Sequence, residues 1–425
     1  MTAEIGVMNN NGIALAADSA VTIENYNREK IYNSANKLFM LSKYCPVAIM
    51  VYGNATINGI PWEIAIKEFR RNFKDKKHDH LIEYAKSFFD YLKNDFINRE
   101  NLDKWFDRQC REACIYVKNQ VEKAVKDKLD GGGEFSLEDM QSFIQTTVSK
   151  IVSFIINNKD LTFNEQIAKM MDEKHFAKCR EVIVGIFNKT PLSEEAICEL
   201  STAMLVWYNK DIFIPQSGIV IAGYGQSEML PSLIEYNVEG IIPDIVKHKQ
   251  SSVYQITEGN SLIVPFAQKD AVWTFCKGID PELESVIGNS IDVMLQERYP
   301  QKVVEIIKDM GGTFDEQILL NKLKELGSGC FKGIVDSVEN HKNKNFIQPL
   351  VNTASMLPLE EMASMAETFV NLSSIRKRFT SQSETVGGPI DVCVISKGDG
   401  FIWMKRKHYF DPNFNQHFSQ NYYKD

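Results

Sequence analysis

The sequence predicts an α+β protein in which short antiparallel strands alternate with two long helical blocks. Residues 1–60 are rich in apolar, β-branched runs separated by Asn and Gly, and they are expected to form the first part of a core. Apolar residues then recur at three- and four-residue spacing, which predicts a mostly helical insertion over 61–215 and a helical segment over 281–379. Strands return in 216–280, where they lead into a helix, and in 380–425, which adds a C-terminal tail.

The first strands form a hairpin. Alternating apolar residues predict strands over Ile5–Met8 and Ile13–Ala17. The intervening Asn9–Gly12 contains Asn-Gly, a strong hairpin signal because both residues tolerate a positive φ. A carboxylate, Asp18, ends the second strand.

Thr2 stands in front of this hairpin, directly after Met1. Removal of Met1 would leave a threonine at the N-terminus. Such a residue carries a hydroxyl nucleophile beside a free α-amine that can act as its base. The start of the chain therefore predicts a nucleophile.

The later strands form further hairpins. Gly218–Gly223 with Leu233–Val238 is expected to be a second hairpin, and Val253–Ile256 with Leu262–Val264 a third. A helix is expected from about Gln268. The last hairpin lies within the closing segment, with its turn at residues 397–399, where the chain reads Lys-Gly-Asp.

Composition narrows the function classes. The formal charge of −8 and the isoelectric point near 5.6 argue against a general nucleic-acid binder, which needs an excess of Lys and Arg. No apolar run reaches the roughly 18 residues that a membrane span needs, and no signal peptide precedes the hairpin, so a cytoplasmic location is expected. The eight cysteines are scattered; Cys110 and Cys114 lack a second pair for zinc, so buried free thiols are expected.

Three segments together resemble the proteasome β-subunits and the related peptidase subunit of bacterial ATP-dependent proteases. The stretch from Thr2 to Asp18 matches that family's opening hairpin without a gap. Lys37-Leu38-Phe39 resembles its lysine motif, and residues 47–53 (Val-Ala-Ile-Met-Val-Tyr-Gly) resemble its glycine-ended strand. The resemblance implies the N-terminal nucleophile (Ntn) hydrolase fold, a four-layer αββα sandwich of two antiparallel sheets, here with large helical insertions.

The resemblance also implies roles for four residues. Thr2 would be the nucleophile, and Asp18 would keep Lys37 charged and oriented beside it. The amide of Gly53 would stabilise the oxyanion of the tetrahedral intermediate. Lys30 is the alternative to Lys37; we prefer Lys37 because an apolar strand that ends in glycine follows it, whereas the polar stretch around Lys30 is expected to be a solvated loop.

Further positions follow from the same alignment. The family supports its terminal amine with an Asp and a Ser near a closing Ser-Gly-Gly; Ser383 stands at the Asp position here, and the adjacent Glu384 is a substitute. Val21, Val51 and Ala55 would line a small apolar pocket for the residue before the scissile bond. No metal and no cofactor are implied.

The sequence therefore predicts a threonine-type peptidase or amidase. Its partners would be a peptide or another amide substrate and further copies of the same chain, without nucleic acid or membrane. Two alternatives stay open: an amidase for a small molecule, and a catalytically silent, proteasome-like assembly or scaffold protein. Retention of Met1 would favour the silent alternative, because a blocked amine cannot act as the base.

Overall fold

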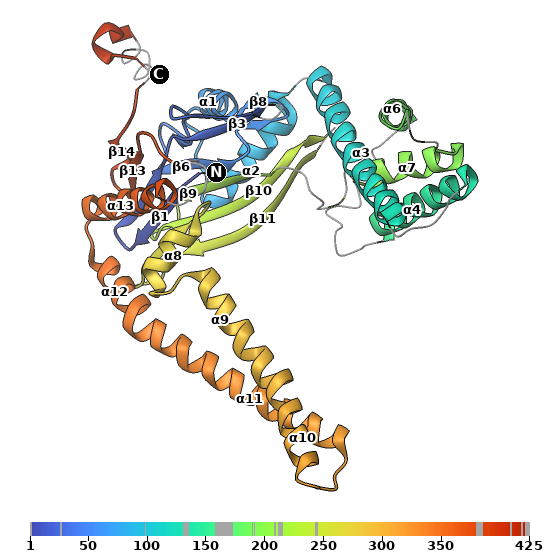
Figure 1. The fold of residues 1–425 in the computed structure, drawn as a ribbon. Helices are drawn as coiled ribbons and strands as arrows, with labels where there is room; N and C mark the ends of the chain where they lie inside the picture. The colour runs from blue at the N-terminus through green and yellow to red at the C-terminus, as the bar shows by residue number, and fades with distance from the viewer. Residues whose placement is uncertain are drawn as a thin grey trace.

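The fold is mixed α/β and is built around two five-stranded antiparallel sheets (Figure 1). The computed structural model describes residues 2–25, 28–97, 99–130, 136–157, 173–188, 190, 192–207, 210, 216–242, 245–379, 386–408, 410–417 and 420. The strands of the first sheet, in spatial order, are β12 (Leu262–Pro265), β1 (Glu4–Asn9), β2 (Gly12–Ala17), β13 (Asp391–Ser396) and β14 (Gly400–Lys405). Those of the second sheet are β11 (Ile245–Gln255), β10 (Ser232–Ile242), β9 (Ser217–Gly223), β6 (Val47–Gly53) and β5 (Leu38–Met40).

The opening hairpin forms in the expected place but turns differently. Asn9 pairs with Gly12, so the two turn residues are Asn10 and Asn11, and neither has a positive φ. The glycine instead begins β2 with φ 155°, and a Cβ there would lie 2.3 Å from the carbonyl oxygen of Ile395 on β13. Gly12 is therefore required by the close approach of a third strand rather than by the turn.

The expected third hairpin is wrong. β11 pairs with β10 in the second sheet, whereas β12 pairs with β1 in the first, with Ile5 opposite Pro265. The chain thus passes from one sheet to the other between these strands. Alternation of apolar residues predicts a strand but not its neighbour, and the long β10 offers pairing over its whole length to β11.

The polar stretch before Lys37 contributes to a pair of strands where a loop was expected. β3 (Val21–Asn25) and β4 (Arg28–Tyr32) pair as a separate two-stranded ribbon. Lys30 lies on β4 and is exposed, as expected of a solvated lysine.

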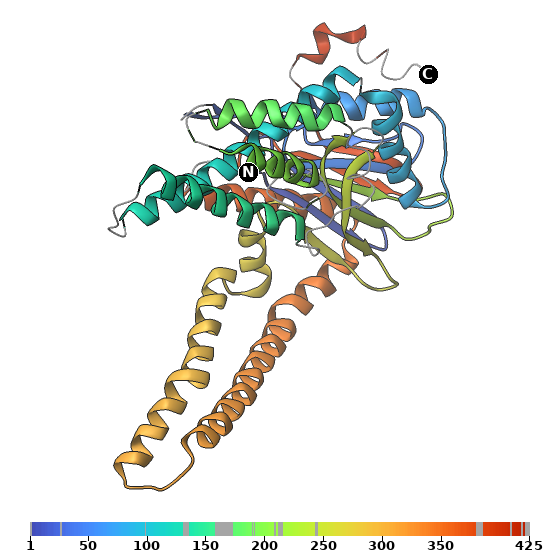
Figure 2. The same ribbon diagram turned by 90° about the vertical axis from the view of Figure 1, so that its right-hand side faces the viewer.

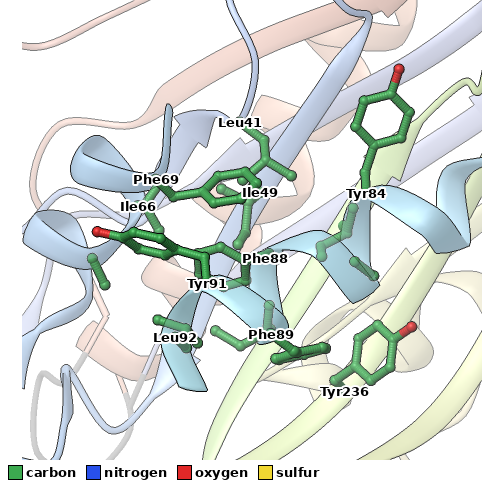
Figure 3. Packing of buried hydrophobic residues seen from close by; sticks show 14 of the residues in the cluster. Leu41, Ile49, Ile66, Phe69, Tyr84, Phe88, Phe89, Tyr91, Leu92 and Tyr236 are labelled. Atoms are coloured by element: carbon green, nitrogen blue, oxygen red, sulfur yellow. The ribbon is translucent and has the colours of Figure 1, made fainter. Parts of the chain in front are cut away.

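Hydrophobic side chains form one cluster between the two sheets and one on the outer face of each. The middle cluster includes Met8 and Leu15 from the first sheet and Met50 and Val220 from the second. Helices α8 (Lys269–Lys277) and α13 (Leu359–Arg378) cover the outer face of the first sheet. Helices α1 (Trp62–Phe73) and α2 (Leu81–Tyr91) cover the second, where aromatic rings such as Phe69 and Phe88 pack edge to face (Figure 3).

The first helical block lies beside the second sheet (Figure 1). Its buried side chains form a separate hydrophobic cluster. Its helices are α3 (Arg99–Asp130), α4 (Leu137–Asn157), α6 (Glu173–Ile186) and α7 (Glu194–Trp207). Cys110 and Cys114 are buried free thiols in this cluster, as the sequence predicts. Among the eight cysteines, Cys198 and Cys330 depart from that expectation because both are exposed.

The second helical block projects from the core as a long hairpin, which we call the arm, residues 281–356 (Figures 1 and 2). One side runs through α9 (Pro281–Val293), the π-turn η3 (Met294–Arg298) and α10 (Tyr299–Asp309). The other runs through α11 (Glu316–Lys342), the π-turn η4 (Asn343–Ile347) and α12 (Gln348–Met356). In α9 no residue is buried, and in α11 only two are. None of the described helices has the length and apolar character of a membrane span.

Candidate functional site

Thr2, Asp18 and Lys37 meet at the end of the opening hairpin. The ammonium group of Lys37 donates to Thr2 Oγ1 at 3.0 Å and to Asp18 Oδ1 at 2.6 Å. All three side chains are buried, with Thr2 and Lys37 each 6% exposed and Asp18 1% exposed. The lysine therefore links the threonine hydroxyl to the carboxylate in a site largely shielded from water.

Backbone groups fix the carboxylate of Asp18. Its Oδ1 accepts the amide of Ala3 at 3.1 Å, and its Oδ2 accepts the amides of Ala20 at 3.2 Å and Gly387 at 3.0 Å. The amide of Asp18 in turn donates to the carbonyl oxygen of Ala3 at 3.1 Å. These bonds join the start of β1, the end of β2 and the approach to β13, and they fix the orientation of the carboxylate.

Lys37 reaches the site from the opposite sheet. The strand that follows it, β5, pairs with β6 in the second sheet and not with the opening hairpin. The carbonyl oxygen of Lys37 accepts the amide of Val51 at 2.8 Å, which holds the lysine backbone against β6. Its side chain thus crosses between the sheets, while Lys30 stays exposed on the ribbon.

A second acid, Glu4, lies in the same buried region and was missed by the sequence analysis. It is 1% exposed, and neither of its carboxyl oxygens has a hydrogen-bond partner among the described residues. Burial raises the pKa of Glu4 well above its ordinary value, the nearby charge of Lys37 lowers it, and that of Asp18 raises it further. A charged residue inside the otherwise apolar start of β1 was the sequence signal that could have revealed it.

The C-terminal segment adds a cluster of charges next to Lys37. Arg406 Nη1 donates to Asp391 Oδ2 at 2.7 Å and to the carbonyl oxygen of Leu38 at 3.3 Å. Lys407 donates to the same Asp391 from its backbone amide at 2.9 Å and from Nζ at 2.6 Å. Burial lowers the pKa of Lys407, Asp391 raises it, and the charges of Arg406 and Lys37 lower it. Arg406 therefore connects the first sheet to the residue that follows Lys37.

The remaining expected site residues occupy different surroundings. Gly53 ends β6 with φ 78° and is exposed, and a Cβ there would lie 2.6 Å from the carbonyl oxygen of Gln216, so glycine is required. Val21 is half-buried on β3, Ala55 is exposed after β6, and Val51 is buried in the cluster beneath α1 and α2. An oxyanion role for Gly53 and a pocket role for the other three stay predictions.

Two expected residues, Ser383 and Glu384, lie outside the described part of the chain, as does Met1. Within the described part, no group of three or more His, Cys, Asp or Glu residues is arranged to hold a metal ion.

The arrangement can activate a hydroxyl group. A lysine ammonium 3.0 Å from Thr2 Oγ1 stabilises the developing alkoxide by charge, and the carboxylate of Asp18 keeps that ammonium in place. Burial strengthens both interactions because the effective dielectric constant falls away from water.

Comparisons with known proteins leave the family of this chain open. No family profile matches the sequence, and no curated protein matches it. Searches by structure find an Anbu mutant from Hyphomicrobium sp. strain MC1 at 8% identity, with 99% of this chain and 95% of that chain covered. They also find a helical assembly of the Anbu complex from Pseudomonas aeruginosa at 9% identity, with 99% of this chain and 92% of that chain covered. A third structure is Anbu, described as an ancestral β-subunit, from Yersinia bercovieri at 10% identity, with 99% of this chain and 94% of that chain covered. The TM-score is 0.28 in each case, too low for these similarities to carry an argument about this chain.

Proposed function

We propose that this chain is a proteasome-like, threonine-type N-terminal nucleophile hydrolase that cleaves peptide or other amide bonds through Thr2 after Met1 is removed. One observation carries the proposal: Lys37 lies within hydrogen-bonding distance of both Thr2 Oγ1 and Asp18 Oδ1. The resemblance of the opening hairpin and of Lys37-Leu38-Phe39 to the proteasome β-subunits selects the same three residues independently of any distance.

The layer order supports the proposed fold. Helices α8 and α13 cover one sheet, α1 and α2 cover the other, and a hydrophobic cluster lies between the sheets. We interpret this order as the four-layer αββα sandwich of Ntn hydrolases, with the first helical block and the arm as additions to it.

The proposed reaction begins at the threonine hydroxyl. The free α-amine accepts the hydroxyl proton while Oγ1 attacks the carbonyl carbon of the amide, and the charge of Lys37 favours the developing alkoxide. The oxyanion of the tetrahedral intermediate would be stabilised by the amide of Gly53. Collapse of the intermediate transfers the proton to the leaving amine and leaves an ester on Thr2, which water hydrolyses by the same proton transfers in reverse.

The catalytically silent alternative is favoured by one observation, the burial of the site. A substrate carbonyl must reach a hydroxyl group that is only 6% exposed. If Met1 is retained, the amine that should act as the base is also blocked. A proteasome-like assembly or scaffold protein would then keep the ion pair of Lys37 and Asp18 for stability alone.

Covalent labelling separates these functions. We expect a β-lactone or a peptide epoxyketone to add one adduct mass to the purified protein, at Thr2, and intact mass to show the loss of Met1. Thr2→Ala should abolish the adduct because the nucleophilic oxygen is gone. Undiminished labelling of the Ala variant would contradict the assignment, and retained Met1 with no adduct would favour the silent protein.

Two lysine variants form a matched pair for the same assay. Lys37→Ala removes the ammonium next to Thr2 and should slow labelling by at least about 100-fold, the usual cost of losing one electrostatic stabiliser. Lys30→Ala removes an exposed lysine of the ribbon and should leave the rate within about twofold, because solvent screens such a charge. Equal effects of the two variants would remove Lys37 from the mechanism.

A further inference from the structure

Glu4 is a carboxyl group enclosed between the two sheets. On β1, Ile5 and Val7 pack on the helix-covered face, whereas Met8 belongs to the cluster between the sheets. Side chains alternate along a strand, so Glu4 shares the face of Met8 and points toward the second sheet. A buried carboxyl without a hydrogen-bond partner is costly and rare, so its presence calls for a physical reason.

Charged and titratable groups surround Glu4 on several elements. Lys37, before β5, and Asp18, after β2, both act on it electrostatically. Glu4 in turn acts on Tyr52 of β6, whose hydroxyl donates to Glu235 of β10. Beyond Lys37 lies the cluster of charges contributed by β13 and the C-terminal segment, namely Asp391, Arg406 and Lys407.

The two acids next to Lys37 differ in their hydrogen bonds. Asp18 accepts three backbone amides and the ammonium group. Glu4 accepts no hydrogen bond from the described residues and is buried, and this burial raises its pKa well above the ordinary value. With Glu4 neutral, the charges of Asp18 and Lys37 cancel, and the ammonium group has a further hydrogen to share with Thr2 Oγ1.

We propose that Glu4 is a positioning residue that controls how strongly Lys37 engages Thr2. Neutral Glu4 leaves the ammonium group shared between Asp18 and Thr2 Oγ1. Loss of the Glu4 proton to solvent creates a second anion in the same buried space, and this anion draws the ammonium group away from the hydroxyl. The effect on rate rests on the proposed function of Thr2, but the coupling of Glu4 to Lys37 can be measured without any activity.

The first test observes Lys37 directly by NMR in the full chain labelled with 13C-lysine. The Lys37 signal, identified by its loss in Lys37→Arg, should shift as the pH is raised over the whole range in which the protein stays folded, following the ionisation of Glu4. Glu4→Gln should remove this shift. Glu235→Gln, which changes another acid between the same sheets, should retain it. A Lys37 signal that does not shift in the unmutated protein would overturn the proposal even if Glu4→Gln failed to fold, and so would an unchanged shift in Glu4→Gln.

The second test measures the rate at which a β-lactone labels Thr2 over the same pH range. A permanently neutral Gln cannot attract the Lys37 ammonium group away from Thr2. As the pH rises and Glu4 ionises in the unmutated protein, the ratio of the Glu4→Gln labelling rate to the unmutated labelling rate should therefore rise about tenfold. A ratio independent of pH would overturn the proposal. If no variant is labelled but the Lys37 shift still requires Glu4, the hydrolase function fails while the coupling stands.

Discussion

At the scale of single residues, the burial of Glu4 makes stability depend on pH. Burial raises the pKa of Glu4 in the folded protein above its ordinary 4.5, so the folded state keeps a proton that the unfolded chain loses. The contribution of this group to stability is therefore complete below about pH 4.5 and is lost as the pH rises from there through the folded-state pKa.

Glu4→Gln should therefore gain stability relative to the unmutated protein as the pH rises. Gln cannot ionise, so the difference in free energy of unfolding between the two proteins should grow above about pH 4.5 by about 1.4 kcal/mol for each unit of pKa displacement. Thermal unfolding at several pH values would measure this difference. A difference that stays constant with pH would mean that Glu4 ionises equally easily in both states.

At the scale of elements, the segment after β14 connects the two sheets by hydrogen bonds beside the site. Arg406 bonds Asp391 of the first sheet and the carbonyl oxygen of Leu38 in the second. Both contacts come from the single nitrogen Nη1, which carries two N–H donors. The C-terminal part of the chain thus helps to position Lys37, which precedes Leu38.

Arg406→Ala should lower the free energy of unfolding by about 2 kcal/mol, because it removes charged hydrogen bonds from the buried Asp391. It should also slow the labelling of Thr2, since the backbone next to Lys37 loses a contact. Chemical denaturation and the labelling assay would measure the two effects. Arg111→Ala, which removes a 2.9 Å contact to Asp107 on the exposed surface of α3, should cost at most about 1 kcal/mol. Equal losses of unfolding free energy in the two variants would contradict the proposed role of Arg406 in connecting the two sheets.

At the scale of the whole molecule, the arm and the sheets should differ in local stability. In α9 no residue is buried, and in α11 only Gly327 and Lys342 are, whereas every residue of β1 and β2 is buried. Little apolar burial means a small free energy for local opening.

Amide hydrogen exchange followed by mass spectrometry should show this difference. Peptides from 281–342 should exchange deuterium orders of magnitude faster than peptides from β1 and β2, because few contacts oppose opening of the arm. A shorter chain that lacks the arm would show whether protection of the sheets is independent of it. Equal protection of the arm and the sheets would mean that another surface covers the arm in solution.

The sequence by itself determined the local pattern of strands and helices. Alternating apolar residues located the opening hairpin, and the resemblance of residues 2–18 and 37–39 to the proteasome β-subunits selected the three side chains that lie together. The helical period of 281–379 predicted a helical segment, which the structure contains. The hairpin and the helical segment were predictable because strand and helix periods are local properties of the chain.

The tertiary structure decided which strands are neighbours. It assigned β11 and β12 to different sheets, placed β5 in the sheet opposite the first hairpin, and made Gly12 necessary through the approach of β13. It also buried Glu4 beside Lys37 and placed Arg406 where it contacts both sheets. Such contacts join residues far apart in the chain, and their energies depend on burial and on partners that a local pattern does not contain.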